Sequence, residues 1–195
     1  MEPDLSPRAA EITSSARLLL AAGGYNSFSY ADISADVGIS KASIHHHFPS
    51  KADLVRTVVL EYRAQAREGM AALDTQIADP LKQLQAYTGF WSQCIRDGRT
   101  SFCIGAMLAA ELPAIPAEVA DVVRGHFEDL CAWLTRVLSR GAAQGRLFLR
   151  ADAHAEALAL MATVHGAMLA ARAYGDAAIF DAIIQPHIDR LTSPN

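Results

Sequence analysis

Residues 29–51 read Ser-Tyr-Ala-Asp-Ile-Ser-Ala-Asp-Val-Gly-Ile-Ser-Lys-Ala-Ser-Ile-His-His-His-Phe-Pro-Ser-Lys, and this stretch predicts two short helices joined by a tight turn. Ser29 and Asp32 have the spacing of a capping box, in which each side chain accepts a hydrogen bond from a backbone amide at the other end of the box. The first helix should end at Gly38, because glycine readily takes the left-handed conformation that closes a helix. Ser40 can then cap the second helix.

The two helices can share a small core and leave one polar face outside. The apolar positions that can pack between them are Ile33, Val37, Ile39, Ile44 and Phe48. The positions left outside are Lys41, Ala42, Ser43, His45, His46 and His47. The free amides at the start of the second helix carry partial positive charge, and Ser40, Lys41 and Ser43 add donors that can approach a phosphate or a base edge. The stretch therefore predicts a helix-turn-helix whose second helix can enter a DNA major groove.

The rest of the chain predicts further helices. Pro49 cannot continue the second helix, and Ser50 with Asp53 forms another capping box, which opens a long amphipathic helix over residues 51–77. Because no strand-like alternation or internal repeat competes with this pattern, the predicted fold class is all-α. The other helices are expected at residues 7–23, 80–97, 102–112, 117–144, 152–174 and 176–191.

Composition limits the classes of protein to which the chain can belong. With 195 residues and 51% hydrophobic content, it can bury a sizeable core. No apolar run reaches the ~18 residues expected of a membrane span, and the acidic N-terminus is unlike a signal peptide, so we expect a cytoplasmic protein with no membrane partner. The net charge is −4, so DNA binding must rest on geometry rather than on a basic domain. Three cysteines without paired spacing do not indicate a disulfide framework.

The order of capping residues, glycine and apolar positions across residues 8–58 resembles the DNA-binding domain of the TetR family of bacterial transcriptional regulators. The residues that carry this resemblance are Asp32, Ile33, Val37, Gly38, Ile39, Ser40, Ser43, Ile44, His47, Phe48, Ser50, Lys51 and Leu54. One position departs from the family pattern, because Ile44 and His45 stand where the family usually has a Leu-Tyr pair whose tyrosine contacts a phosphate. A phosphate contact by His45 would depend on its protonation state and tautomer.

The resemblance implies two domains. Residues 1–50 would form a three-helix N-terminal helix-turn-helix DNA-binding domain. Residues 51–195 would form a C-terminal helical ligand-binding and dimerisation domain, in which residues 51–77 are the connecting helix. The family pairs two subunits through a four-helix bundle of its last two long helices, so we expect a homodimer through about residues 151–191, which suits a palindromic operator. The many small residues there would allow close helix approach, although packing inside one subunit is the simpler alternative.

The function implied by the resemblance is a DNA-binding transcriptional regulator. We expect a repressor that a small-molecule inducer in the C-terminal domain releases from double-stranded operator DNA. An enzyme and a cofactor are not expected, because the chain has no Gly-rich phosphate loop, no Gly-x-Ser-x-Gly elbow and no His-Glu-x-x-His or Cys-x-x-Cys pattern. An alternative of another class is a helical small-molecule-binding protein or enzyme without DNA binding. The expected DNA-binding residues are Ser29, Tyr30, Ser40, Lys41, Ala42, Ser43, His45, His46 and Lys51.

Large apolar side chains on the central helices are candidates for a ligand pocket. A cavity with aromatic and methionine walls, and with His126, His165 or Arg172 as polar handles, is typical of a small-molecule site. Taken one at a time, these side chains are more often ordinary core, and a pocket among them is implied by the family. The expected ligand-binding residues are Tyr87, Trp91, Cys94, Phe102, Cys103, Met107, Phe127, Trp133, His165 and Met168.

Cys103 carries a second hypothesis of regulation. It follows Thr100 and Ser101, either of which could cap the next helix, and a thiolate near that helix N-terminus would be stabilised. The setting also resembles a branch of the family whose repressors sense electrophiles or oxidants through a cysteine in this region. A buried and inert cysteine is the simpler interpretation.

The run His45-His46-His47 does not predict a metal site. Successive helical residues point about 100° apart, whereas side chains on one face of a helix lie about three or four residues apart. The family match implies that His45 and His46 face DNA, and that His47 packs or forms a hydrogen bond beside Phe48.

Overall fold

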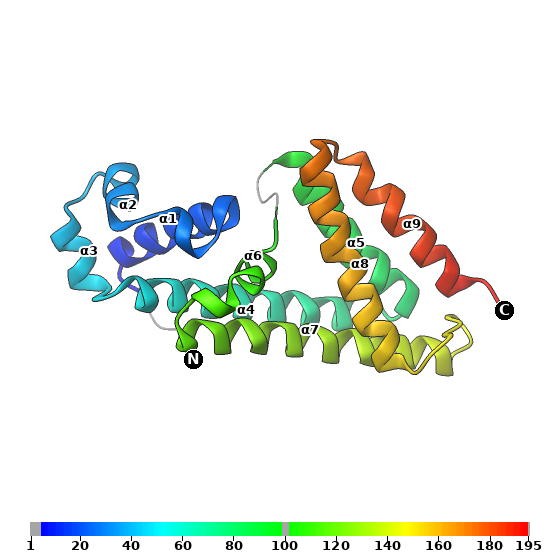
Figure 1. The fold of residues 1–195 in the computed structure, drawn as a ribbon. Helices are drawn as coiled ribbons and strands as arrows, with labels where there is room; N and C mark the ends of the chain where they lie inside the picture. The colour runs from blue at the N-terminus through cyan, green and yellow to red at the C-terminus, as the bar shows by residue number, and fades with distance from the viewer. Residues whose placement is uncertain (1–4, 99–101, 195) are drawn as a thin grey trace. The chain divides into compact units, whose positions relative to one another are not determined.

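The computed structural model describes residues 5–98 and 102–194, and these residues form helices with no strand among them. The predicted all-α fold class is therefore confirmed, and Figure 1 shows the course of the chain. The elements are α1 (Pro7–Gly23), the short 3-10 helix η1 (Tyr25–Ser27), α2 (Tyr30–Val37), α3 (Lys41–His47), α4 (Lys51–Gln76), α5 (Pro80–Asp97), α6 (Ile104–Ala110), the 3-10 helix η2 (Leu112–Ala114), α7 (Ala117–Ala143), α8 (Ala153–Tyr174) and α9 (Ala178–Thr192).

The helices gather into two compact units. The first unit contains the residues up to Ala66 together with Phe102–His126, and the second contains residues 67–101 together with the residues from Phe127 onward. α4 and α7 each contribute residues to both units. The predicted domain boundary between residues 50 and 51 follows the helix-turn-helix rather than these units, and it stays a prediction.

Side-chain caps begin several helices where the sequence places them. At α2, the amide of Ala31 donates to Ser29 Oγ at 3.1 Å and the amide of Ser29 donates to Asp32 Oδ2 at 2.7 Å, which confirms the first capping box. At α4, the amide of Asp53 donates to Ser50 Oγ at 3.1 Å and the amide of Ser50 donates to Asp53 Oδ2 at 3.0 Å. Side chains also cap α1 at Ser6, α5 at Asp79 and α8 at Asp152.

The helix predicted at residues 102–112 is shorter than expected. α6 begins at Ile104, because the extended backbone of Cys103 (φ −67°, ψ 120°) makes Cys103 the N-cap. The helix also ends earlier, before the 3-10 helix η2. The proposed caps Thr100 and Ser101 lie outside the described residues.

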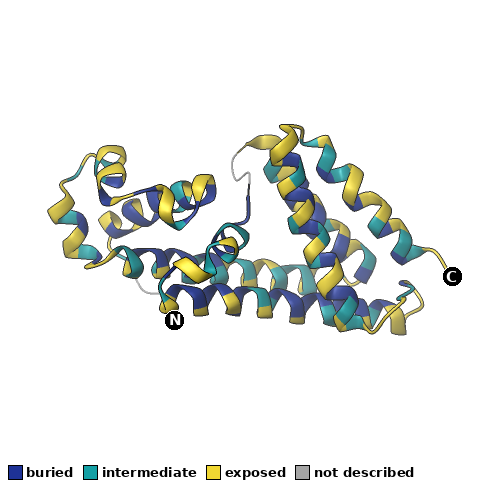
Figure 2. Ribbon diagram, viewed as in Figure 1, coloured by how far each residue is buried: buried dark blue, intermediate teal, exposed yellow. Residues whose placement is uncertain are grey.

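The helix-turn-helix has the predicted core with one difference. Ile33, Ile44 and Phe48 are buried, whereas Val37 and Ile39 are only half-buried. Figure 2 shows the buried side of each helix in dark blue. In the second unit, the large buried side chains include Leu84, Trp133, Leu134, Leu160 and Phe180.

One described helix is apolar enough to raise the question of a membrane span. α8 passes that test by length and composition, and 33% of its most apolar window is buried. The core helix of a soluble protein passes the same test, so this is weak evidence for a span.

Candidate nucleic-acid interface and regulatory sites

The turn between α2 and α3 is built around Gly38. Gly38 has φ 71° and ψ 34°, a left-handed conformation that costs a residue with a Cβ atom about 1–2 kcal/mol. Among the described residues, nothing lies within 4 Å of the place where that Cβ would be, so the requirement for glycine is conformational. The hydroxyl of Ser34 donates to the carbonyl of Ile39 at 2.5 Å. The turn is thus fixed by its own residues, and it sets the direction of α3.

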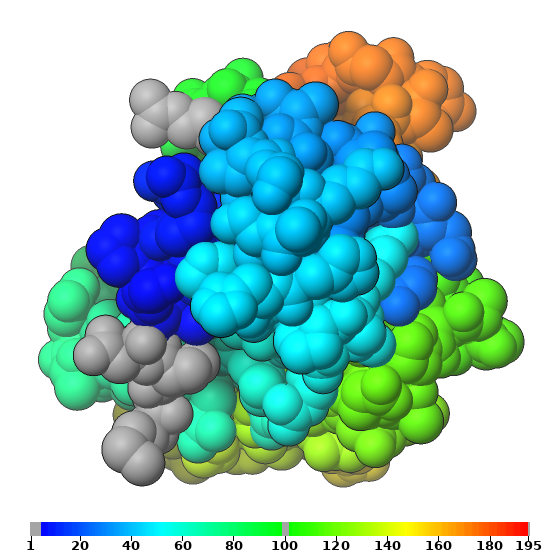
Figure 3. All heavy atoms as spheres, turned by 90° about the vertical axis from the view of Figure 1, so that its left-hand side faces the viewer, coloured from blue at the N-terminus to red at the C-terminus, as the bar shows by residue number. Residues whose placement is uncertain are grey.

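α3 presents a polar face to solvent. Its buried residue Ile44 anchors the helix, and its first turn is capped by Ser40, whose Oγ accepts from the amide of Ser43 at 3.2 Å. Figure 3 looks onto α2 and α3, whose blue-to-cyan atoms face the viewer. Of the residues expected to bind DNA, Ser29, Ser40, Lys41, Ala42, His45 and His46 are exposed and Ser43 is half-buried.

Tyr30 lies inside rather than on this face. Its hydroxyl donates to the carbonyl of Phe48 at 2.9 Å, and its ring meets that of His45 edge to face at 4.8 Å. Burial, with a smaller contribution from Asp53, raises the pKa of Tyr30 to about 12, so the phenol stays a neutral donor. The Tyr30 hydroxyl, which was expected to contact DNA, is thus already bonded in this structure. It joins the start of α2 to the end of α3.

His45 is the residue that replaces the usual tyrosine. Its Nδ1 lies 3.2 Å from the carbonyl oxygen of Pro49, a contact that requires the proton on Nδ1. Nε2 is then an acceptor in the neutral ring and a donor in the protonated ring. A phosphate contact through Nε2 would therefore require the protonated form of His45.

Lys51 also differs from the expected phosphate contact. Its Nζ donates to the carbonyl of Phe28 and lies 4.7 Å from the centre of the Tyr25 ring and 4.2 Å from that of Phe28. Burial lowers the pKa of Lys51, and the charges of Glu111 and Asp32 oppose that shift. The ammonium group thus holds the segment between α1 and α2, while Lys41 remains exposed on α3.

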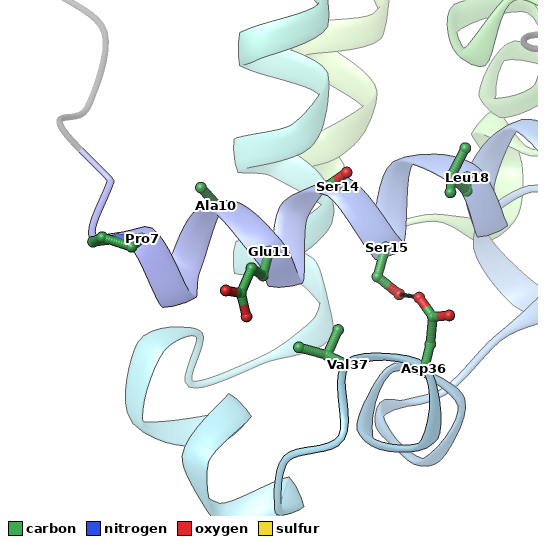
Figure 4. A pocket seen from close by; sticks show the side chains of 8 residues that line it. All are labelled: Pro7, Ala10, Glu11, Ser14, Ser15, Leu18, Asp36 and Val37. Carbon is green, nitrogen blue, oxygen red and sulfur yellow. Dashed lines mark hydrogen bonds between the residues drawn. The ribbon is translucent and has the colours of Figure 1, made fainter.

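A shallow groove of about 500 Å³ lies between α1 and α2, and Figure 4 shows its lining. Ser15 Oγ donates to Asp36 Oδ2 at 2.6 Å across it, which ties the two helices together. The carboxylates of Glu11 and Asp36 make this groove unsuited to a phosphate backbone, so the candidate DNA surface is confined to the α3 side. The groove is lined by Pro7, Ala10, Glu11, Ser14, Ser15, Leu18, Asp36 and Val37.

Cys103 is buried in the first unit beside two ring side chains. The hydroxyl of Tyr62 donates to its Sγ at 3.1 Å, and His126 Nε2 lies 4.0 Å from the sulfur. Burial raises the pKa of the Cys103 thiol, although the bonds from Tyr62 and from two backbone amides act in the opposite direction. The predicted thiolate stabilisation at a helix N-terminus is therefore outweighed by desolvation, and the resting cysteine is a thiol.

Glu111, the residue directly after α6, bonds to the turn that follows α1. The amide of Tyr25 donates to its Oε2 at 2.5 Å, and the amide of Asn26 donates to its Oε1 at 3.3 Å. Because these partners lie about 85 residues away in the sequence, no local pattern could have indicated the contact.

In the second unit, a groove of about 550 Å³ lies between α7 and α8. Its walls are mainly apolar, and within it Cys131 Sγ lies 3.6 Å from His154 Nδ1. No group of three metal-ligating side chains occurs within residues 5–98 and 102–194. The groove is lined by Phe127, Glu128, Cys131, Ala132, Thr135, Arg136, His154, Leu158 and Met161.

His165 provides a buried polar atom next to this groove. Its ring lies 5.2 Å from that of Phe127, and its Nε2 is buried with no hydrogen-bond partner among the described residues. Burial lowers the pKa of His165 to about 4, against a weaker opposing contribution from a backbone bond at Met161. The ring is therefore neutral near pH 7 and has an unused acceptor or donor at Nε2.

The residues expected to bind ligand are divided between the two units. Phe102, Cys103 and Met107 belong to the first unit, and the other seven belong to the second. The Trp133 indole donates to Asp74 Oδ1 at 3.2 Å, and its ring packs 5.7 Å from that of Tyr87, which is the environment of a core residue. Of the ten, Tyr87, Trp91, Phe102, Cys103, Trp133 and Met168 are buried, and Cys94, Met107, Phe127 and His165 are half-buried.

α8 has an exposed face that is almost free of polar groups. Leu158 and Leu169 are 44% and 59% exposed, and the exposed positions between them are small. On α9, Ile183 is 37% exposed. The exposed residues of α8 from the first to the second leucine are Leu158, Ala159, Ala162, Gly166 and Leu169, which together form the apolar α8 face.

Comparisons with known proteins agree with this architecture. Residues 12–58 match the family model described as bacterial regulatory proteins, tetR family, and residues 80–186 match the one described as tetracyclin repressor-like, C-terminal domain. No curated protein is matched at a significant level of sequence similarity.

Solved structures extend the likeness to nearly the whole chain. A TetR family transcriptional regulator from Agrobacterium tumefaciens is 56% identical, with a TM-score of 0.94 over 95% of this chain and 98% of that one. A TetR transcriptional regulator from Legionella pneumophila is 24% identical, with a TM-score of 0.86 over 97% of this chain and 100% of that one. The reduced form of NemR from E. coli is 16% identical, with a TM-score of 0.82 over 95% of this chain and 98% of that one, and it is similar in fold alone.

Proposed function

Because the chain belongs to the TetR family of bacterial transcriptional regulators, we propose that it is a repressor that a small-molecule inducer releases from its operator. In this proposal the protein acts in the cytoplasm as a homodimer on a palindromic double-stranded site. The family is one of regulators rather than enzymes.

The observation that carries this proposal is the exposed polar face of α3, the helix that follows the Gly38 turn. The helix is short, capped by Ser40 and anchored by Ile44, so the backbone positions from which its exposed side chains project are fixed. We assign direct DNA contacts to Ser29, Ser40, Lys41, Ala42, Ser43, His45 and His46. We assign Tyr30 and Lys51 a supporting role, because both polar groups are used inside the first unit.

The apolar α8 face supports the dimer. Exposed leucines flanking small residues on one side of a helix are costly in water and allow a second helix to approach closely. We propose that this face and the exposed side of α9, within residues 151–191, meet the same surface of a second copy. Two copies related by a two-fold axis would place two α3 helices on the two halves of a palindrome.

The groove between α7 and α8 supports an inducer site in the second unit. Its apolar wall suits a partly hydrophobic molecule. His165, whose ring packs 5.2 Å from that of the lining residue Phe127, has an unused Nε2 that could form a hydrogen bond. Induction then requires that the inducer bind the DNA-incompetent state more tightly than the DNA-bound state.

A second candidate, covalent sensing at Cys103, is favoured by the Tyr62 and His126 contacts. His126 could accept the thiol proton while the sulfur adds to the carbon of an α,β-unsaturated carbonyl compound, with the proton then passing to that adduct. Since the sulfur is fully buried, the reaction needs an opening of the first unit. Treatment with N-ethylmaleimide should release DNA from the wild type and spare Cys103→Ser, and equal release from both would remove this candidate.

The repressor proposal is tested by a gel shift on the DNA that flanks the protein's own gene, across a salt series. A specific complex that survives excess unrelated DNA, and weakens as salt rises, is the expected result. Equal binding to the flanking DNA and to unrelated DNA, or no binding at the lowest salt, would contradict the proposal. The chain would then be assigned to the alternative class, a helical small-molecule-binding protein that does not bind DNA.

A further inference from the structure

We propose that Glu111 is a positioning residue for DNA binding, which couples α6 to the head formed by α1–α3. Its carboxylate holds the turn that follows α1, so the head keeps one orientation while this contact is intact. This inference rests on the proposed function, because it concerns how the α3 helices are presented to the operator.

The contact is made to three donors of a single turn. The amides of Tyr25 and Asn26 donate to Glu111 Oε2 and Oε1 at 2.5 and 3.3 Å, and the Asn26 side-chain amide donates to Oε1 at 3.2 Å. These backbone amides are the free ones at the start of η1, which has no side-chain cap of its own. Glu111 therefore supplies, from a distant part of the chain, the cap that the head lacks.

Gly24 shows that the close approach is built into the backbone. A Cβ at Gly24 would lie 2.3 Å from Glu111 Oε2 and 2.9 Å from its Cδ, and the glycine itself has φ 84°. Any larger residue there would push the carboxylate away. The same position thus needs glycine both for its conformation and for the space that Glu111 occupies.

The held turn leads directly to the candidate DNA surface. η1 is followed by Phe28, whose carbonyl accepts from Lys51 at the start of α4, and by Ser29, which caps α2. The charge of Glu111 also acts on Lys51, since it opposes the lowering of the lysine pKa. Displacement of the turn would therefore disturb the anchors of α2 at its N-terminal end.

On its other side, Glu111 is the residue directly after α6. This helix spans Ile104–Ala110 and begins beside Cys103, which contacts Tyr62 and His126. A helix of this length is about 10 Å long and moves as one piece. A shift at the cysteine end of α6 would thus reach the head through Glu111.

The test varies the spacing between the two operator half-sites. Each inserted base pair rotates one half-site by about 35° about the DNA axis, so a dimer with fixed heads should lose about tenfold or more in affinity per insertion. We call the dependence of affinity on half-site spacing the spacing profile. Glu111→Gln removes the charge and one acceptor, and it should flatten the spacing profile, so that each insertion lowers affinity by about threefold or less. The matched control is Asp121→Asn, an exposed carboxylate on α7 of the same unit.

Two further variants keep the test decisive if Glu111→Gln folds poorly. Asn26→Asp replaces a donor with a second carboxylate on an exposed side chain and should flatten the profile in the same way. Gly24→Ala should do so by expelling Glu111, and it should also lower the melting temperature through its strained backbone. Its effect on the spacing dependence should not add to that of Glu111→Ala, because both variants lose the same contact. Melting temperatures establish that each variant is folded.

The outcomes separate the inference from the function on which it rests. A flattened profile in the Glu111 and Asn26 variants, with a wild-type profile in Asp121→Asn, is the expected result. An equal loss of affinity at every spacing would reduce Glu111 to a structural role, and an unchanged profile would overturn the inference outright. Absence of specific binding by the wild type would overturn the repressor proposal itself, and the role of Glu111 in DNA binding with it.

Discussion

The face of α3 and the apolar α8 face are both exposed helical surfaces, yet their chemistry is opposite. The α3 face carries Lys41, His45 and His46, whereas the α8 face from Leu158 to Leu169 exposes no charged side chain. A polyanion such as DNA can bind the polar α3 face, whereas the apolar α8 face is stabilised only by contact with another apolar surface. Exposure alone therefore does not identify a partner, and the kind of group exposed does.

The largest effect should come from a charge placed on the α8 face. Gly166 has open space around its Cβ position, so Gly166→Arg should leave the fold intact and block only the approach of a second copy. Loss of the dimer should lower operator affinity about a thousandfold, because two linked half-site contacts become one. Light scattering with the gel shift measures both effects. Gly69→Arg is the matched control, since Gly69 is an exposed α4 glycine with equally open surroundings.

If Gly166→Arg remained a dimer with wild-type affinity, the subunits would be joined elsewhere. The apolar α8 face would then not be the subunit interface, and its exposed leucines would need another partner.

The next effect concerns His165, a half-buried residue of α8 whose Nε2 is shielded from solvent. Its folded pKa of about 4 lies below the ordinary histidine value of 6.5, so the unfolded chain binds the proton more readily. Stability is therefore complete above pH 6.5 and falls as the pH drops towards 4, by about 3 kcal/mol for this group. Denaturant unfolding at a series of pH values should show this loss in the wild type and a weaker one in His165→Phe. An equal pH dependence in both proteins would remove His165 as its source.

A smaller effect is expected from Tyr30→Phe, which tests the support beneath the α3 face. The change removes the hydroxyl that donates to Phe48 and leaves a buried carbonyl unpaired, at a cost of about 1–2 kcal/mol. Stability should fall by that amount, and operator affinity several-fold, because the end of α3 loses its tether. Wild-type stability with a large loss of affinity would instead mean that the hydroxyl contacts DNA directly.

The smallest effect on stability should follow Lys41→Ala, a change on the exposed face of α3 itself. Loss of one phosphate contact per subunit should weaken binding about tenfold on every sequence tested and reduce the slope of log affinity against log salt by about 1 per contact. Arg124→Ala, an exposed cation on α7, is the control. A slope identical to that of the wild type would place Lys41 away from the DNA backbone.

The helix-turn-helix could be read from the sequence because its determinants are local. The capping boxes at Ser29 and Ser50 and the left-handed Gly38 involve residues only a few positions apart, and the structure confirms each of them. Tyr30 and Lys51 stay predicted DNA contacts, but their polar groups already bond to the carbonyls of Phe48 and Phe28, which sequence spacing does not reveal.

The ligand region was harder to predict for a physical reason. Buried aromatic residues look alike in sequence whether they fill a core or line a cavity, so Trp133 and Phe127 were placed in one set. The structure separates them, because the indole of Trp133 is bonded to Asp74 while Phe127 borders an open groove. The contact of Glu111 with the turn after α1 could not be predicted, since its partners lie about 85 residues away.

The most direct test of the central claim is a footprint of the purified protein on the DNA flanking its own gene. Two protected half-sites, related by a two-fold axis and separated by about one turn of the DNA helix or a multiple of it, are the predicted result. The protection should disappear with Gly166→Arg and weaken with Lys41→Ala. Uniform or absent protection across fragments that include the gene's own flanks would contradict the account.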